Sequence, residues 1–318
     1  MISVAMTSYN GEKYIQKQLD SILNQTLKVD EIIICDDGST DRTVEILKQY
    51  PVTLYQNEKN LGYRLNFKKA MELCSGDFVF LCDQDDIWYE NKVEKMVDIM
   101  KNNANIHVLA SSFEYIDAKD KPIIMKQKHH FSNNNLYPKE IKKDALVEVT
   151  FDEYLPMNYF QGCSLVMDKW IKNLVLDHFD SRLPHDWLLS MAAASYHGMF
   201  FLNMPLFQYR LHDSNSIGVE YLTQTTSEHV KKAKSLELRM QNAKNALIVL
   251  EDVEALNRSY YETRKDEFLR LRFFLIKHNQ YLEKNNFIGL IKQNFSPFYK
   301  KIKTKKARLM DLIFVLIK

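Results

Sequence analysis

Short apolar runs alternate with amphipathic segments along the first hundred residues. Buried strands are expected at 2–6, 31–35, 52–55 and 77–82, where apolar residues cluster. Helices are expected over 12–24, over 61–74 and from about residue 90. A further helix is expected to follow the turn at 36–41 and to end near residue 50, with Ser39 or Thr40 as its cap. This alternation predicts an α/β fold, with a mostly parallel sheet, right-handed crossovers and flanking helices.

The second half of the chain has a different pattern. Residues 126–145 are polar and basic and are expected to form loops. From about Thr226 the spacing becomes helical, first through Leu236, Met240, Ala243, Leu247 and Leu250, then through Phe268, Leu271, Leu275 and Leu282. We therefore predict an α/β domain over residues 1–222 and a helical C-terminal region over residues 223–318.

Composition excludes several common classes of site. The 46% hydrophobic and 26% charged content is that of a globular protein. The eight glycines are spread so widely that neither a G-x-G-x-x-G dinucleotide loop nor a Walker-type phosphate loop is present. There is also no C-x-x-C and no H-E-x-x-H, so the usual thioredoxin and zinc signatures are absent.

Charge is concentrated at the C-terminal end. The net charge is +2, but residues 287–318 hold eight basic residues and one acid, which leaves the rest of the chain acidic. Interleaved apolar residues suit this segment to lying on an anionic membrane surface, and packing against the helical region or a second subunit of a homodimer is the alternative. The acidic body argues against nucleic-acid binding. With no leader, no bilayer-length apolar run and few cysteines, we expect a cytoplasmic protein, peripheral to the inner face of the membrane.

Polar clusters follow three of the predicted strands, at residues 7–10, 36–37 and 83–86. Ligands of open α/β sheets bind beyond the carboxyl ends of the strands, so these clusters should share one crevice. Asp83, Asp85 and Asp86 repel one another, and a hard divalent cation is the usual remedy. The structural alternative is one helix-capping aspartate beside two solvated ones.

Four segments resemble the motif series of family 2 glycosyltransferases: ISVAMTSYNGEKY at 2–14, EIIICDDGSTDRT at 31–43, NLG at 60–62 and LCDQDDIW at 81–88. Two later segments, HDW at 185–187 and YRLHDSN at 209–215, resemble bacterial polysaccharide rhamnosyltransferases of that family. The resemblance implies a GT-A fold and an inverting, metal-dependent glycosyltransferase. It further implies a dTDP-sugar or UDP-sugar donor, a saccharide or polyprenyl-linked acceptor, and Mg²⁺ or Mn²⁺.

The resemblance also implies roles for individual residues. On the donor side, Thr7 and Tyr9 would frame the pyrimidine, and Asp37 would accept a hydrogen bond from its N3–H. Arg64 would reach a phosphate or the base, and Asp83 would lie near the ribose. The cation would be held by Asp85, with His212 as a further metal contact. Asp186 would be the catalytic base, with Trp187 and Gln161 on the acceptor side.

Each assignment has a structural alternative. Tyr9 could be a core-edge aromatic, Asp37 a turn residue and Arg64 a solvated helix residue. Asp186 could form a surface ion pair, His212 could be a packed histidine, and a glycine turn would explain the residues around Gln161. For the donor, dTDP-L-rhamnose is the first expectation, and UDP-hexoses or UDP-N-acetylhexosamines are the alternative. A nucleotide-sugar-binding protein without catalysis is the alternative of a different class.

Overall fold

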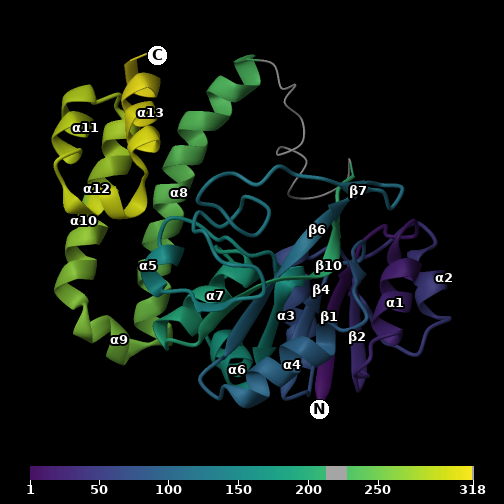
Figure 1. The fold of residues 1–318 in the computed structure, drawn as a ribbon. Coiled ribbons are helices and arrows are strands. Elements are labelled where there is room, and N and C mark those ends of the chain that lie inside the picture. The colour runs from purple at the N-terminus through teal and green to yellow at the C-terminus, as the bar shows by residue number, and fades with distance from the viewer. Residues whose placement is uncertain (213–227, 317–318) are drawn as a thin grey trace. The chain divides into compact units, whose positions relative to one another are not determined.

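The structure is a computed structural model that describes residues 1–212 and 228–316 (Figure 1). The strands in these residues are β1 (Ile2–Ser8), β2 (Glu31–Asp36), β3 (Thr53–Gln56), β4 (Phe78–Cys82), β5 (Ile87–Trp88), β6 (Val108–Ile116), β7 (Pro122–Ile123), β8 (Leu146–Glu148), β9 (Leu165–Asp168) and β10 (Met199–Arg210). The helices are α1 (Ile15–Leu23), α2 (Thr43–Leu47), α3 (Tyr63–Leu73), α4 (Lys92–Asn102), α5 (Phe151–Tyr154), the 3₁₀ turn η1 (Gly162–Ser164), α6 (Lys169–Asp177), α7 (His185–Ser195), α8 (Glu228–Leu256), α9 (Arg258–Thr263), α10 (Lys265–Glu283), α11 (Phe287–Gln293), α12 (Pro297–Ile302) and α13 (Lys305–Leu316).

All ten strands of the described residues belong to one sheet. Its main order is β3-β2-β1-β4-β9-β6-β10-β5, with β7 beside β6 and β8 beside β10. The pairs β2–β3, β1–β2, β1–β4 and β6–β10 are parallel. Strand β9 runs antiparallel to both of its neighbours, β4 and β6. The predicted mostly parallel sheet flanked by helices is therefore confirmed.

Helices cover both faces of this sheet because the buried strands are apolar on both sides. On one face, Val4 and Met6 of β1 belong to a core cluster with Leu19 of α1 and Met96 of α4. On the other face, α3 contacts β1, β2, α6 and α7. The ends of β1, β2 and β4 therefore project from a layer that is buried between helices on both faces.

The predicted elements of the first hundred residues are present, with one error at a helix cap. The predicted capping by Ser39 or Thr40 is wrong, since α2 begins only at Thr43 with Arg42 at its N-cap. The Ser39 hydroxyl instead donates to Asp36, 2.6 Å away, so it closes the turn rather than the helix. The expected loop over 126–145 holds no helix or strand.

The described chain forms two compact units. One runs from Met1 to Val149 and resumes at Tyr159 through β10, and the other joins Thr150–Asn158 to the C-terminal helices (Figure 1). The predicted domain boundary at residue 222, the helix start near Thr226 and the DSN end of the later motif fall within 213–227, outside the described residues. The two predicted C-terminal helices correspond to α8 and α10.

The basic segment 287–318 folds into the C-terminal unit through an ionic centre. Asp311 of α13 is fully buried and accepts from Arg239 of α8, 2.7 Å away, from Lys303, 2.8 Å away, and from the Tyr299 hydroxyl of α12. The segment therefore packs its buried side within the helical unit, as one of the two expectations had it. Among the described helices, none combines the length and apolarity needed to cross a bilayer.

Candidate active site

The carboxyl ends of β1, β2 and β4 lie side by side. Met6 of β1 pairs with Cys82 of β4, and Ser8 pairs with Asp36 of β2. The buried Asp36 carboxylate accepts from the Ser8 hydroxyl at 2.8 Å, and from the Ser39 amide at 2.9 Å. The Asp36 side chain thus links the ends of β1 and β2, so within the Asp36-Asp37 pair Asp36 has a structural role.

Gln84 clamps the Tyr9 backbone, joining the first strand end to the fourth. Its Oε1 accepts from the Tyr9 N–H at 2.8 Å, and its Nε2 donates to the Tyr9 carbonyl at 3.0 Å. A Cβ on Gly11 would lie 2.2 Å from Gln84 Oε1, so the glycine leaves room for the clamp. The Tyr9 side chain is 48% exposed above this point, free to present its ring. Thr7 lies half-buried on β1 beside Cys35.

Asp37 organises the loop before α3. One carboxylate oxygen accepts from the Leu61 N–H at 2.8 Å and the Asn57 side-chain amide at 2.8 Å, and the other accepts from the Gly62 N–H at 2.9 Å. Gly62 has a φ of 80°, a conformation that favours glycine. Asp37 is 3% exposed, so the carboxylate predicted to meet the base also holds the NLG motif in place.

The turn after β4 gathers three carboxylates in a poorly solvated place. Burial, together with the nearby charges of Asp85 and Asp186, raises the pKa of Asp83 to about 7. Burial and the charges of Asp85 and Asp83 likewise raise the pKa of Asp86 well above its usual range. Crowded carboxylates of this kind are stabilised when a cation binds among them.

Two residues from other elements complete the surroundings of this turn. The Cys163 sulfur of η1 lies within 4.8 Å of oxygens of both Asp83 and Asp86. Lys92 of α4 is fully buried between the rings of Trp88 and Phe207, with its Nζ 4.2 Å from each ring centroid, and donates to the Cys163 carbonyl at 2.7 Å. Burial lowers the pKa of Lys92 to about 8.

The donor set fits a divalent cation. Oδ2 of Asp86 is buried and has no hydrogen-bond partner of normal geometry in the described part of the chain, which is costly unless a ligand satisfies it. Asp85 lies beside it and receives a hydrogen bond from His212, whose Nε2 is 2.8 Å from Asp85 Oδ2. Carboxylate oxygens are the ligands that Mg²⁺ and Mn²⁺ prefer. The structure thus brings Asp85 and His212 together, as the sequence led us to expect.

Asp186 lies in the first turn of helix α7, close to the acidic turn. Its Oδ1 accepts from the Trp187 N–H at 2.8 Å, and its charge acts on Asp83. The positive end of the helix dipole favours an ionised carboxylate at this position. Trp187 itself is only 5% exposed, so it packs inside the wall of the site.

Arg64 and His185 support the start of this helix. Arg64 of α3 donates to the carbonyls of Ser181 and Arg182, at 2.8 and 3.0 Å, and so anchors the loop before α7. His185 stacks on Phe67, with ring centroids 4.1 Å apart, and burial together with the Arg64 charge lowers its pKa to about 3. Arg64 therefore has a structural task in addition to any contact with a phosphate or base.

Gln161 lies next to η1, where the chain enters β9. Its carbonyl accepts from the Ser164 N–H at 2.9 Å, while its side-chain Oε1 is buried and makes no hydrogen bond to any described residue. At the next position, a Cβ on Gly162 would lie 2.8 Å from His185 Nε2, so this turn packs directly against α7. Gln161 and Asp186 therefore come from neighbouring segments.

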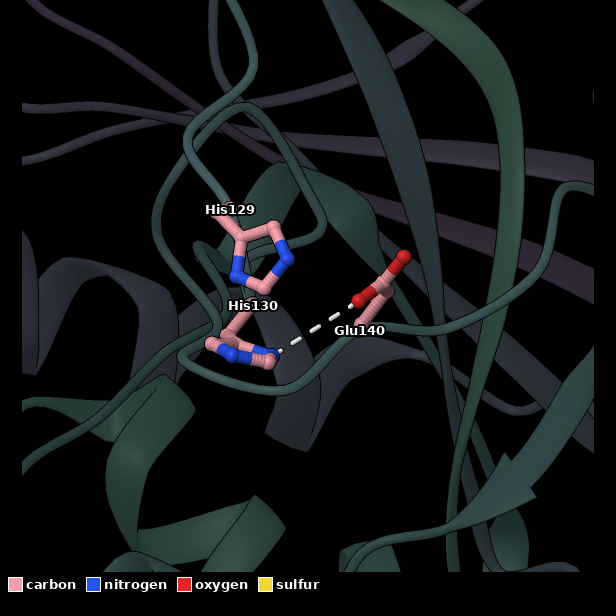
Figure 2. Close-up of side chains that lie close together, drawn as sticks. All are labelled: His129, His130 and Glu140. Atoms are coloured by element: carbon pink, nitrogen blue, oxygen red, sulfur yellow. Dashed lines mark ion pairs between the residues drawn. The ribbon is translucent and has the colours of Figure 1, made fainter.

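A second group of possible metal ligands lies in the 126–145 loop. His129, His130 and Glu140 have donor atoms within 4.8 Å of one another, and His130 Nδ1 lies 3.7 Å from Glu140 Oε2 (Figure 2). All three side chains are exposed, so solvation lets them separate at little cost. This group is a weaker candidate than the buried acidic turn.

Three residues that contact the site were given no role in the sequence analysis: Gln84, Lys92 and Arg210. Gln84 and Arg210 lie within the LCDQDDIW and YRLHDSN segments, but the local pattern does not reveal where their side chains point. Lys92 had one signal, since it shares the apolar face of its helix with Val93, Met96 and Met100. A lysine on such a face is either paired or close to a functional group.

Comparisons with known proteins identify the family of the chain. Residues 3–161 match the family model described as glycosyl transferase family 2. The dTDP-rhamnosyl transferase RfbG of Shigella flexneri is 28% identical over 233 residues, covering 67% of this chain and 73% of RfbG. An uncharacterized glycosyltransferase of Methanocaldococcus jannaschii is 32% identical over 184 residues, covering 56% of this chain and 59% of that protein, which is less than two thirds of its length.

Solved structures show the same architecture. S. aureus TarS in complex with UDP superposes with a TM-score of 0.53 at 17% identity, covering 99% of this chain and 89% of that one. The mannosyltransferase PcManGT of Pyrobaculum calidifontis, in complex with GDP-Man and Mn²⁺, superposes with a TM-score of 0.50 at 14% identity, covering 100% of this chain and 86% of that one. The fold is that of the GT-A glycosyltransferases, and the chain belongs to glycosyltransferase family 2.

Proposed function

We propose that the protein is an inverting, metal-dependent glycosyltransferase that moves L-rhamnose from dTDP-L-rhamnose onto a growing cell-surface saccharide or lipid-linked oligosaccharide. The observation that carries the proposal is that the acidic turn and Asp186 lie close together. The acidic turn of Asp83, Asp85 and Asp86 lies at one side, and Asp186 lies close enough to act electrostatically on Asp83.

The donor nucleotide lies over the ends of β1 and β2. The exposed Tyr9 ring offers a stacking surface for a pyrimidine, with Thr7 beside it. Asp37 accepts the base N3–H in addition to the loop donors it already holds, since an ionised carboxylate has about four acceptor positions. This favours thymine or uracil over cytosine. Arg64 and Asp83 face the phosphates and the ribose.

Catalysis needs a proton acceptor and a way to release a charged leaving group. Asp186 accepts the proton of the acceptor hydroxyl as that oxygen attacks the anomeric carbon, a contribution of roughly 10²–10⁴ in rate. Attack from the face opposite the departing nucleotide diphosphate inverts the configuration. Mg²⁺ or Mn²⁺ on Asp85, with Asp86 Oδ2 as a further oxygen, would neutralise the leaving diphosphate. His212 would become a further ligand where its Nε2 gives up the hydrogen bond to Asp85. Gln161 and Trp187 shape the acceptor side.

The names of relatives support the donor class. RfbG is named as a dTDP-rhamnosyl transferase, while WfgD of Escherichia coli, 29% identical over 177 residues, is named as a UDP-Glc-dependent glucosyltransferase. The test is donor hydrolysis by the purified protein with dTDP-L-rhamnose, UDP-glucose, UDP-galactose and their N-acetyl forms. We expect metal-dependent release of dTDP above all others. Preference for a UDP-sugar would replace rhamnose, and no turnover of any donor would leave only binding.

Substitution separates the base from the binding site. Asp186→Asn should abolish transfer while UDP or dTDP affinity, measured by calorimetry, stays within about twofold of wild type, since the base acts on the acceptor. Asp177→Asn is the matched control, because Asp177 is an exposed carboxylate at the end of α6. Near-normal transfer by Asp186→Asn would remove Asp186 from the role.

The enzyme works on the cytoplasmic face of the membrane, held there by its C-terminal unit. All four cysteines are free thiols, as expected of a reducing compartment. Ile288 and Phe295 are 67% and 83% exposed, with the exposed Lys292 between them, a combination suited to anionic lipid.

Because the segment also supplies the buried Asp311, point substitutions test membrane binding better than deletion. Ile288→Ser with Phe295→Ser should reduce flotation with phosphatidylglycerol vesicles. Phe273→Ser is the control, since Phe273 of α10 is equally exposed, at 65%, outside this segment. Flotation of both variants at the wild-type level would refute membrane docking through this segment.

A further inference from the structure

Arg210, the last residue of β10, is a charged side chain with no exposed surface. Burying a guanidinium is costly unless its donors and charge are matched. Its backbone N–H donates to Asp86 Oδ1 at 3.0 Å, and its Nε donates to the Asp85 carbonyl at 2.6 Å. Two of its hydrogen bonds therefore end on the acidic turn, one on a side chain and one on the backbone.

The other end of the guanidinium is anchored to the turn after β6. Nη1 donates to the Asp117 carbonyl at 3.1 Å and to the Asp120 carboxylate. The flat face lies over the Tyr14 ring, 4.5 Å from its centroid. The group therefore bridges three segments far apart in sequence, and Asp120 offsets its charge.

The same strand end also sets the position of His212. Two residues beyond Arg210, His212 meets the Asp85 carboxylate at 2.8 Å and lies against the Tyr14 ring, with centroids 4.8 Å apart. Arg210 thus holds the Asp85 backbone, and His212 holds the Asp85 side chain. Together they leave Asp86 Oδ2 as the buried oxygen without a partner of normal geometry among the described residues.

We propose that Arg210 is a positioning residue that holds the Asp85–Asp86 turn in its cation-binding shape before any cation arrives. The inference rests on the proposed metal-dependent function. If the turn is already ordered, cation binding does not have to order it, and the cation binds more tightly. Cation affinity should therefore depend on the hydrogen bonds that the Arg210 guanidinium makes to Asp85, Asp117 and Asp120. Lysine keeps the charge, but it cannot donate from one rigid plane to both Asp85 and Asp117.

The experiment measures Mn²⁺ binding without a donor sugar, by calorimetry and by the electron paramagnetic resonance of free Mn²⁺, alone and with UDP. Arg210→Lys should weaken Mn²⁺ binding about tenfold or more, as changes behind a metal ligand usually do. Asp120→Asn removes the outer anchor and should weaken it by a smaller factor. The melting temperature of each variant is recorded in metal-free buffer.

Lys172→Gln is the matched control. Lys172 is a buried cation in the same unit, 4% exposed, and donates to the Cys74 and Met71 carbonyls near the amino end of β4, away from the acidic turn. It should lower the melting temperature and leave the Mn²⁺ dissociation constant unchanged.

The possible results separate the two claims. Mn²⁺ binding by Arg210→Lys at wild-type strength, with a lower melting temperature, would show a role in stability only and overturn the inference. If Arg210→Lys does not fold, Asp120→Asn decides, and an unchanged Mn²⁺ affinity in that variant counts against the inference. Wild-type protein that binds UDP identically with and without Mn²⁺ would instead refute the proposed metal dependence.

Discussion

The two hydrogen bonds by which Gln84 holds the Tyr9 backbone predict an energetic coupling between Gly11 and Gln84, which are 73 residues apart. Gly11→Ala would place a Cβ 2.2 Å from Gln84 Oε1 and 2.6 Å from its Cδ, so the amide must swing away. Both hydrogen bonds to Tyr9, at 2.8 and 3.0 Å, would be lost with that movement. Gln84→Ala removes the same two bonds directly.

The magnitude follows from those bonds. Two neutral hydrogen bonds at about 0.5–1.5 kcal/mol each give a loss of about 1–3 kcal/mol for either single substitution. In the Gln84→Ala background there is no amide to displace, so adding Gly11→Ala should cost about zero. The lower entropy of the unfolded chain could even return about 0.4–1 kcal/mol. The expected coupling free energy is therefore about 1–3 kcal/mol, the range found for residues in contact.

The assay is urea unfolding of the two single variants and the double variant, followed by tyrosine and tryptophan fluorescence. Gly62→Ala is the control, because Gly62 has a φ of 80° and nothing within 4 Å of an added Cβ. Its cost is backbone strain alone and should add to that of Gln84→Ala without coupling. Additive effects of Gly11→Ala and Gln84→Ala would refute the clamp.

Three further predictions concern buried groups. Burial lowers the pKa of His185 to about 3 from 6.5, so between these pH values its ring is neutral in the folded chain and protonated in the unfolded chain. The free energy of unfolding should therefore fall as the pH drops from about 6.5 toward 3. In thermal melts at stepped pH, His185→Gln should make the melting temperature depend less on pH over this range. Asp37→Asn replaces one acceptor oxygen by an NH₂ group that faces a backbone N–H, and should lower the free energy of urea unfolding by about 2–4 kcal/mol. A decrease smaller than the measurement error would contradict the hydrogen bonds described. Asp311→Asn should cost about 3–5 kcal/mol by removing the charge that Arg239 and Lys303 share, seen as an earlier calorimetric transition with UDP affinity unchanged.

The helices and strands of the first hundred residues could be predicted because each one has a clear pattern of apolar and polar residues within its own segment. The run from Ile32 to Cys35 is apolar at every position, and a polar turn follows it directly. A continuous apolar run of this length is typical of a parallel-sheet strand that is buried on both faces. Short crossovers then bring the strand ends together. Asp37 and Asp83 could be assigned to one crevice for this reason alone.

The rest depends on contacts that the local pattern does not contain. Strand β10 shifts register twice along β6, near Leu202 and Pro205, so its alternation is broken. Strand β9 has only four residues. Arg210 meets Asp86 across 124 residues, and the strand pattern gives no hint that its side chain turns inward. Such pairings follow from tertiary packing and need the structure.

The reversed direction of β9 has a consequence for how this chain can vary in evolution. A strand running the other way begins where its neighbour β4 ends, so Cys163 of η1, just before β9, reaches the acidic turn. The chain between the end of β7 and η1 therefore need not pass between β4 and β9, and within it β8 alone joins the sheet, beside β10. Exchanges at exposed positions within 126–145 can therefore alter the outer surface of this loop, whereas the buried Tyr137, and Asn134, which donates to the Phe113 carbonyl, tie its middle to the core and should vary little.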